Sequence, residues 1–227
     1  MAMHGLGGGL AGVLFDLDGV LVDTARFHFL AWKRLAEELG VGFNERINHG
    51  FRGVGRMVCL EMLLGEHERF FGIEEKRLLA ERKNGYYLEL VKELGPGDLA
   101  KGAKELAESL RACGVRLGLV SASCNARLVL RLLGIVSWFD AIVDGSECAG
   151  KREGFLRAAR KMQVRAEHCV VIEDAEAGVT GARAAGMKCV GIGAGAVGAD
   201  IRVMELEQVR MGMMEEMVGI RPASSSV

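Results

Sequence analysis

The sequence reads Leu14-Phe-Asp-Leu-Asp-Gly-Val-Leu-Val-Asp-Thr24 near its N-terminus, and this stretch decides the fold. The apolar run at 12–17 has the length of a strand, and two carboxylates, Asp16 and Asp18, stand at its end. Charged side chains at the end of a buried strand cost free energy unless a partner or a task compensates for them. We therefore expect a functional site where the first strand ends.

Further apolar runs of strand length are rich in Val, Ile and Leu and lie at 115–120, 141–143, 169–172 and 188–192. Each of them is preceded or followed by a helix-like pattern. Near-continuous apolar strands that alternate with helices are typical of a parallel sheet with both faces covered. The sequence therefore predicts an α/β fold with a doubly wound, Rossmann-like parallel sheet.

The segment that follows the first strand breaks this alternation. Apolar residues recur at helical spacing from Phe29 to Leu39, and two more helix-like stretches follow without a convincing strand. We interpret this segment as a helical cap domain inserted into the core. The predicted boundaries are 25–95 for the cap and 1–24 together with 96–227 for the core.

Composition argues against several classes of function. Lys and Arg number 29 against 30 Asp and Glu, and the basic residues are scattered, so nucleic acid is not an expected partner. The longest apolar stretch is interrupted by Asp16 and Asp18 and lacks a preceding Lys or Arg, which argues against a signal peptide or a membrane span. The six cysteines form no C-x-x-C pair, so we expect free thiols and no zinc site. We expect a monomer in the cytoplasm.

Polar residues also stand near the ends or connections of the later strands, namely Ser121, Lys151, Glu173 and Asp174. In an open parallel sheet these ends line one crevice, so the four residues can converge on Asp16. A carboxylate nucleophile that attacks a phosphate needs a divalent cation and a positive side chain beside it. The residues available at this crevice therefore suit phosphoryl transfer.

This set predicts a reaction that uses Mg²⁺ as its cofactor. Asp16 is the expected nucleophile and Lys151 the positive side chain, while Ser121 and nearby backbone N–H groups hold the phosphate. Asp18 lies on the same side of an extended chain as Asp16 and is the expected general acid and base. Because Mg²⁺ prefers carboxylate oxygens, the expected metal ligands are Asp16, Asp18, Glu173 and Asp174.

Four short motifs follow one another along the chain, namely the run 16–24, Ser121-Ala-Ser123, Lys151, and Ile172-Glu-Asp174 followed by Ala177-Gly178. They resemble, in order, the four motifs of the haloacid dehalogenase-like phosphotransferases, and the resemblance covers nearly the whole chain.

Further patterns lie mostly in the expected cap. They are His28 and Trp32 as H-x-x-x-W, Gly53-Val54 and Arg56 as K-G-V-x-R, Arg82-Lys-Asn84 as R-K-N, and in the core Asn125 after S-A-S. Within the superfamily these patterns resemble the β-phosphoglucomutase family most strongly.

The resemblance implies an isomerase of carbohydrate metabolism that acts on a small phosphorylated sugar. In its cycle Asp16 is phosphorylated, and β-glucose 1-phosphate becomes glucose 6-phosphate through a bound 1,6-bisphosphate. It assigns Thr24 to the hinge near the nucleophile, His28 to the support of Asp18, and Arg56 to the distal phosphate. The implied phosphate-binding residues are Ser121, Ala122 and Lys151. The implied substrate-binding residues are Thr24, His28, Trp32, Arg52, Gly53, Val54, Arg56, Lys83, Ser123 and Asn125.

Two other functions remain open. A sugar-phosphate phosphatase would use the same aspartyl-phosphate with water as the second acceptor, which makes it a hydrolase. A catalytically silent sugar-phosphate binder is suggested by departures from the family pattern, because Arg52 replaces Lys, Gly55 replaces Ser, and the run from Lys151 reads Lys-Arg-Glu-Gly in place of K-P-x-P. The intact Asp16, Asp18 and Asp174 favour catalysis.

The run 193–198 fits the pattern G-x-G-x-x-G and follows an expected strand. A dinucleotide site requires a helix and a further strand after such a run. We expect the chain beyond 198 to run toward a Met-rich helix at 211–217 instead. A dinucleotide cofactor is therefore not predicted.

Overall fold

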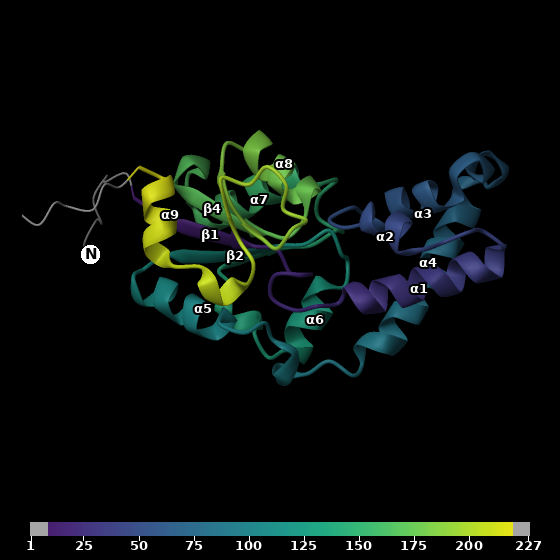
Figure 1. Ribbon diagram of the computed structural model, residues 1–227, viewed down its shortest axis with the longest axis horizontal. Coiled ribbons are helices and arrows are strands. Elements are labelled where there is room, and N and C mark those ends of the chain that lie inside the picture. The colour runs from purple at the N-terminus through teal and green to yellow at the C-terminus, as the bar shows by residue number, and fades with distance from the viewer. Residues whose placement is uncertain (1–8, 220–227) are drawn as a thin grey trace, which may run out of the picture.

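The computed structural model describes residues 9–219, and the centre of the fold is a parallel sheet (Figure 1). Its strands are β1 (Gly12–Phe15), β2 (Arg116–Val120), β3 (Ala141–Val143), β4 (Cys169–Glu173), β5 (Lys188–Ile192) and β6 (Ile201–Val203). Their order across the sheet is β3-β2-β1-β4-β5-β6, and each neighbouring pair is parallel. This arrangement confirms the predicted α/β class and the doubly wound sheet.

Helices cover both faces of the sheet. They are α5 (Ala103–Ala112), α6 (Ala126–Leu132), α7 (Lys151–Met162), α8 (Glu176–Ala184) and α9 (Met211–Met217). Successive strand residues point to opposite faces, so Val13 and Phe15 of β1 pack with α5, α6 and α9, whereas Leu14 packs with α7 and α8. In Figure 1, α7 and α8 lie above the sheet and α5 lies below it. Burial on both faces explains why the strands read as continuous apolar runs.

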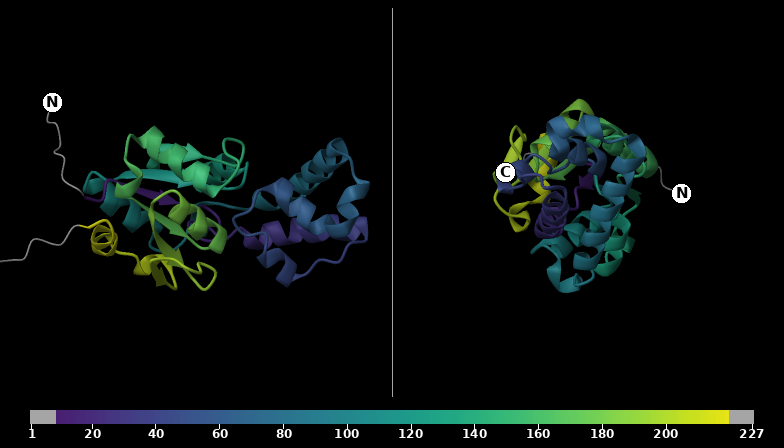
Figure 2. Two further views of the ribbon diagram at one scale, coloured as in Figure 1. Left: turned by 90° about the horizontal axis from the view of Figure 1, so that it is seen from above. Right: turned by 90° about the vertical axis from the view of Figure 1, so that its right-hand side faces the viewer.

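A group of helices is inserted between β1 and α5. It contains α1 (Ala25–Leu39), α2 (Glu45–His49), α3 (Arg56–Leu64) and α4 (Ile73–Val91). These helices share their own apolar core, which includes Trp32, Leu35, Leu60, Leu64 and Leu79. Figure 2 shows them together beyond one end of the sheet, as expected for an inserted helical domain. We call this group the helical segment.

The exact domain boundaries at 25 and 95 stay a prediction, and the ends of the expected core range, 1–8 and 220–227, lie outside the described residues. Short 3₁₀ helices lie in the connections, namely η1 (Gly65–Phe70), η2 (Pro96–Asp98), η3 (Val136–Trp138), η4 (Ala166–His168) and η5 (Leu206–Gln208). All six cysteines lie within the described range and are free thiols, as expected. Within residues 9–219, no helix has both the length and the apolar character needed to cross a membrane.

The chain beyond the run 193–198 leads to the predicted helix at 211–217, which is α9, but it first forms a short strand that was not expected. β6 pairs in parallel with β5, with Val190 opposite Ile201 and Ile192 opposite Val203. It has only three residues and is partly exposed at the sheet edge, so it lacks the long apolar run that marks the other strands. No helix lies between β5 and β6. The requirement for a helix directly after the glycine-rich run is therefore still not met.

Candidate active site

The site begins where β1 ends, between β2 and β4. Phe15 pairs with Leu119 on one side and with Ile172 on the other, and the N–H of Asp16 donates to the carbonyl of Ile172 at 2.9 Å. Asp16 is thus fixed as a direct continuation of the central strand. Ser121 is held in the same way after β2, because its N–H donates to the carbonyl of Val143 at 3.0 Å. Open α/β sheets bind ligands at such carboxyl ends of their central strands.

Three carboxylates meet at this edge. Asp16, Glu173 and Asp174 each place one carboxylate oxygen within 4.8 Å of the others. Asp16 is 3% exposed and Glu173 is fully buried. Burial, and then the neighbouring charge of Glu173, raises the pKa of Asp16 well above its usual value and that of Asp174 to about 7. So much negative charge in one buried place requires a cation.

Lys151 supplies one positive charge to this cluster. It is the first residue of α7, and its Nζ lies 2.6 Å from Oδ1 of Asp16 and also contacts Oε1 of Glu173. Burial alone would lower the pKa of Lys151, but the facing carboxylates of Asp16 and Glu173 raise it. The ammonium group therefore stays charged. The altered run after Lys151 still delivers this residue to the acidic cluster.

The cluster also fits a divalent cation, since its donors are carboxylate oxygens from two adjacent strand ends. Glu173 is held firmly because its Oε2 accepts the backbone N–H groups of Asp174 at 2.9 Å and Ala175 at 3.1 Å. Glycines make room around it. A Cβ at Gly178 would lie 1.9 Å from the Glu173 carboxylate, and one at Gly19 would lie 2.2 Å from Oδ2 of Asp174. The Glu173 carboxylate thus accepts backbone N–H groups just before α8, as an N-cap side chain would, although the N-cap residue of α8 is Ala175.

Asp18 faces a different set of partners. The hydroxyl of Thr24 donates to its Oδ1, and the hydroxyl of Ser121 lies 3.5 Å from its Oδ2. Burial raises the pKa of Asp18, while the Thr24 hydrogen bond opposes that rise. A carboxyl group with a raised pKa suits the donation and removal of protons. The assignment of Asp18 as a metal ligand stays a prediction.

The loop 121–125 forms the wall of the site beside Asp18. Ser121 Oγ accepts the N–H of Ser123 at 3.0 Å, and the Ser123 Oγ accepts the N–H of Asn125 at 3.2 Å. The side-chain amide of Asn125 donates to Oδ1 of Asn84 in α4 at 2.7 Å. This last hydrogen bond joins the core to the helical segment.

The helical segment contributes two nitrogen bases in contact, a buried Lys83 and a partly buried His28. Lys83 Nζ lies 2.9 Å from Nδ1 of His28 and 4.7 Å from the centre of the Trp32 ring. Burial and the nearby Arg56 lower the pKa of Lys83 to about 7. Burial and Lys83 lower the pKa of His28 well below its usual value. Trp32 also packs in the core of the helical segment, with its ring edge-on to Phe51 at 5.4 Å, so it has a structural role in any case.

A cleft of about 770 Å³ joins these groups. The expected site residues that line it are Asp16, Asp18, His28, Trp32, Arg52, Gly53, Val54, Arg56, Lys83, Ala122, Ser123, Asn125, Lys151 and Asp174. Thr24, Ser121 and Glu173 lie behind this lining and contact it through Asp18 and Lys151. The structure thus places these predicted residues in, or directly behind, one cleft. The role of each residue stays a prediction.

Comparisons with known proteins agree with this geometry. Residues 10–186 match the family of haloacid dehalogenase-like hydrolases. The chain belongs to this family. Beta-phosphoglucomutase of Bacillus subtilis strain 168 is 40% identical over 211 residues, which cover 90% of this chain and 93% of that protein. Phosphorylated carbohydrates phosphatase of Thermotoga maritima is 30% identical over 182 residues, covering 78% of this chain and 82% of that protein.

A solved structure supports the same family assignment. The crystal structure of beta-phosphoglucomutase from Clostridium difficile is 35% identical and matches with a TM-score of 0.88, covering 92% of this chain and 97% of that one. The predicted resemblance to haloacid dehalogenase-like enzymes is therefore confirmed.

Three residues in or near the cleft were not expected. Asn84 lines the cleft and was noted only as part of the Arg82-Lys-Asn84 pattern. Tyr87, four residues after Lys83 in α4, stacks on His28 with the ring centres 4.2 Å apart. Helical spacing could have indicated Tyr87 because residues four apart share a helix face. Asp144 is also buried near this edge, and the sequence analysis gave it no role.

Proposed function

We propose that this protein is a Mg²⁺-dependent sugar-phosphate mutase that converts β-glucose 1-phosphate to glucose 6-phosphate through a phosphorylated Asp16. The observation that carries the proposal is that the cleft has cationic groups at two places. Lys151 accompanies Asp16 on the core side, and Arg56 and Lys83 line the cleft from the helical segment. A bisphosphate intermediate requires a cation for each of its phosphates, whereas hydrolysis of a monophosphate requires one.

Asp16, Glu173 and Asp174 would hold the Mg²⁺ ion, with carboxylate donors that match its preference for oxygen. When bound, Mg²⁺ neutralises charge on the phosphate oxygens as the phosphoryl group is transferred. Lys151 adds a positive charge at the same place and reduces the repulsion between the Asp16 carboxylate and the phosphate. The tight packing of Gly178 against Glu173 supports this assignment.

Phosphoryl transfer in this proposal passes through Asp16 twice. Phosphorylated Asp16 first gives its phosphoryl group to the 6-hydroxyl of β-glucose 1-phosphate, while Asp18 accepts the hydroxyl proton. The resulting 1,6-bisphosphate then turns end for end in the cleft. An Asp16 oxygen attacks phosphorus at the 1-position, the bond from phosphorus to the 1-oxygen breaks, and Asp18 returns the proton to that oxygen. Glucose 6-phosphate leaves and Asp16 is phosphorylated again.

The position and raised pKa of Asp18 support its role in this cycle. Thr24 fixes the Asp18 carboxylate through a hydrogen bond, and Thr24 itself is fully buried at the start of α1. Proton transfer by a positioned carboxyl group accelerates such steps by about 10²–10⁴-fold. Action as a monomer in the cytoplasm, without nucleic acid or membrane, remains part of the proposal.

A sugar-phosphate phosphatase is the second candidate, and the Thermotoga maritima relative named phosphorylated carbohydrates phosphatase favours it. The decisive experiment supplies β-glucose 1-phosphate with Mg²⁺ and a trace of the 1,6-bisphosphate, and it measures glucose 6-phosphate and free phosphate separately. Glucose 6-phosphate without equivalent free phosphate supports the mutase. Free phosphate without glucose 6-phosphate refutes the mutase and supports hydrolysis. Calorimetric binding of the sugar phosphate with neither product would identify a silent binder.

A further inference from the structure

Asp144 is a buried carboxylate that the proposed cycle does not use. It directly follows β3, at the same edge of the sheet as Asp16, and is only 4% exposed. The other buried polar and charged residues in the described part of the chain all belong to the expected site, namely Asp16, Thr24, Lys83, Ser121, Lys151 and Glu173. Burial of a carboxylate is costly unless its partners compensate for the lost water. The partners of Asp144 therefore indicate its task.

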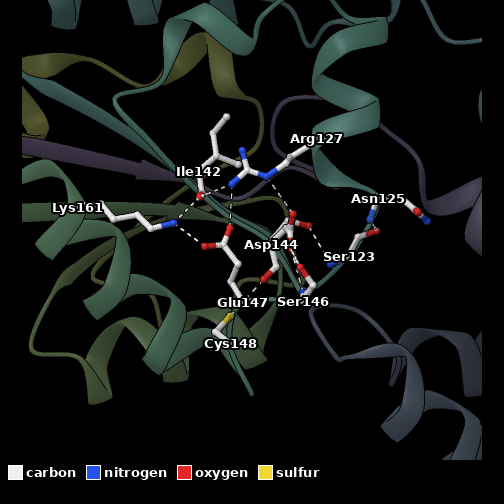
Figure 3. A network of polar contacts seen from close by, with 10 residues as sticks. Ser123, Asn125, Arg127, Ile142, Asp144, Ser146, Glu147, Cys148 and Lys161 are labelled. Atoms are coloured by element: carbon white, nitrogen blue, oxygen red, sulfur yellow. Dashed lines mark hydrogen bonds and ion pairs between the residues drawn. The ribbon is translucent and has the colours of Figure 1, made fainter.

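Asp144 connects two elements beside the end of β3 (Figure 3). Its Oδ2 lies 3.3 Å from Nε of Arg127 in α6, and its Oδ1 accepts the N–H of Ser146 at 3.0 Å together with the Ser146 hydroxyl. Arg127 also donates to the carbonyl of Ile142 at 3.1 Å and to Glu147 at 2.9 Å. The Asp144 carboxylate thus ties the turn that follows β3 to the first turn of α6.

That turn packs directly against the loop 121–125. The N–H of Gly145 donates to the carbonyl of Ser123 at 3.3 Å. A Cβ at Gly145 would lie 2.2 Å from the carbonyl oxygen of Ala122, so the two backbones are in contact. Beyond Asn125 the loop continues into α6, which is held by the same carboxylate. The residue after Asp144 therefore contacts the middle of the loop, and the Asp144 carboxylate holds the helix that follows the loop.

The position of this loop affects the chemistry because Ala122 and Ser123 line the cleft together with Asp16, and the Ser121 hydroxyl lies 3.5 Å from Oδ2 of Asp18. We propose that Asp144 is a positioning residue for phosphate binding, which acts through Arg127 and Gly145 on the loop 121–125. This inference rests on the proposed function, since that function makes the loop a phosphate site. Reacting groups must be held within a fraction of an ångström, so a small loop displacement weakens binding and transfer.

Asp140 provides a matched control at the other end of the same strand. It stands before β3, at the opposite end from Asp144, where its Oδ2 accepts the N–H of Leu117 at 2.9 Å and its Oδ1 pairs with Arg116 at 2.7 Å. Asp140→Asn therefore removes a similar carboxylate with an Arg partner and a backbone partner, but away from the loop. A merely structural role of Asp144 would make the two Asn variants behave alike.

The test measures the affinity of the whole protein for inorganic phosphate by calorimetric titration with Mg²⁺ present, alongside thermal unfolding. We expect Asp144→Asn to weaken phosphate binding about tenfold, the scale of one lost hydrogen bond to a charged group, and Asp140→Asn to leave it unchanged. In the turnover assay, KM should rise more than kcat falls. Unchanged phosphate affinity in Asp144→Asn overturns the inference, as does a wild-type protein that binds no phosphate. The titration needs no turnover, so phosphate binding without glucose 6-phosphate formation refutes the proposed function alone.

Two further variants keep the inference testable if Asp144→Asn does not fold. Ser146→Ala removes one hydrogen bond and keeps the charge, and it should weaken phosphate binding by about threefold. Arg127→Gln should weaken binding, and combining it with Ser146→Ala should cost less than the sum of the two effects, because both act through Asp144. Additive losses, or no loss in either variant, would rule out action through this carboxylate.

Discussion

Lys151 Nζ lies 2.6 Å from Oδ1 of Asp16, although 135 residues separate them in the chain and each side chain is only 5% exposed. The same ammonium group contacts the fully buried Glu173. One buried cation therefore faces two buried carboxylates, with Asp174 beside them. Asp174 also pairs with the guanidinium of Arg52 at 3.7 Å. Two cations thus face three carboxylates, and protonation or a bound metal ion can balance the remaining charge.

Replacing Lys151 with Met should make the fold depend on Mg²⁺. Removing one partner of a buried ion pair leaves uncompensated charge and costs about 3–5 kcal/mol. Bound Mg²⁺ would offset that loss, so the rise in Tm between EDTA and Mg²⁺ should be larger in Lys151→Met than in the wild type. Lys188→Met, which removes an exposed pair with Asp200, is the matched control and should lose at most about 1 kcal/mol. An equal Mg²⁺ effect on all three proteins would contradict this account of the cluster.

Gly178→Ala should damage the acidic cluster, because the new Cβ would lie 1.9 Å from the Glu173 carboxylate. We expect a loss of about 1–3 kcal/mol from overpacking and a fall in Mg²⁺ affinity of at least about tenfold. Calorimetric Mg²⁺ titration and thermal unfolding measure the two effects. Gly85→Ala, in the middle of α4 with open space around it, should instead stabilise the protein by about 0.5–1 kcal/mol. If Gly178→Ala bound Mg²⁺ normally, Glu173 would not be a ligand.

The sheet could be predicted from the sequence where burial on both faces left a clear pattern. β1, β2 and β4 are fully apolar except at their ends, and the expected runs coincide with them. β6 could not be predicted, because a three-residue edge strand buries too little to require an apolar run. Pairing with β5, and not the composition of β6 itself, determines that this segment is a strand.

In the candidate site, too, some residues could be predicted from the sequence and others could not. Asp16, Asp18 and Glu173 could be predicted because carboxylates directly after apolar strands need a physical reason. Asp144 also follows an apolar strand, but its partner Arg127 lies in another element, and nothing in the local pattern indicates their pairing. The contact between Lys83 and His28 likewise joins α4 to α1, so only packing of the helical segment reveals it.

Asp16→Asn should abolish turnover while preserving the fold. The amide cannot act as the nucleophile, and loss of a nucleophile lowers kcat by roughly 10⁴-fold or more. Lys151 keeps its contact with Glu173, so circular dichroism and Tm should remain close to those of the wild type. Asp23→Asn is a control in the same stretch, since the exposed Asp23 accepts only the N–H of Ala25 among the hydrogen bonds described. Appreciable turnover by Asp16→Asn would exclude nucleophilic catalysis by Asp16.

The pKa of Lys83, lowered to about 7 by burial and then by Arg56, predicts opposite pH effects on binding and on stability. The titratable or charged groups around it are Asp18, His28, Arg56, Cys59 and Tyr87. Burial raises the pKa of Cys59 to about 12 and also raises that of Tyr87, while the pKa of His28 lies well below its usual value. Among Lys83 and these neighbours, we therefore expect Lys83 to change charge as the pH rises from 7 to 9, below the ordinary pKa of Lys, about 10.4.

As pH rises through about 7, folded Lys83 loses the charge that attracts a substrate phosphate, so kcat/KM should fall. The unfolded chain still keeps that proton up to about pH 10. Since the unfolded state then binds more protons than the folded state, the free energy of unfolding should rise over the same interval. Profiles of kcat/KM and of Tm against pH measure the two trends. Lys83→Arg should lose the fall in kcat/KM, because its guanidinium stays charged. This control separates the titration of Lys83 from that of the substrate phosphate, which has a pKa of about 6. A fall that persists unchanged in Lys83→Arg would assign the titration to another group.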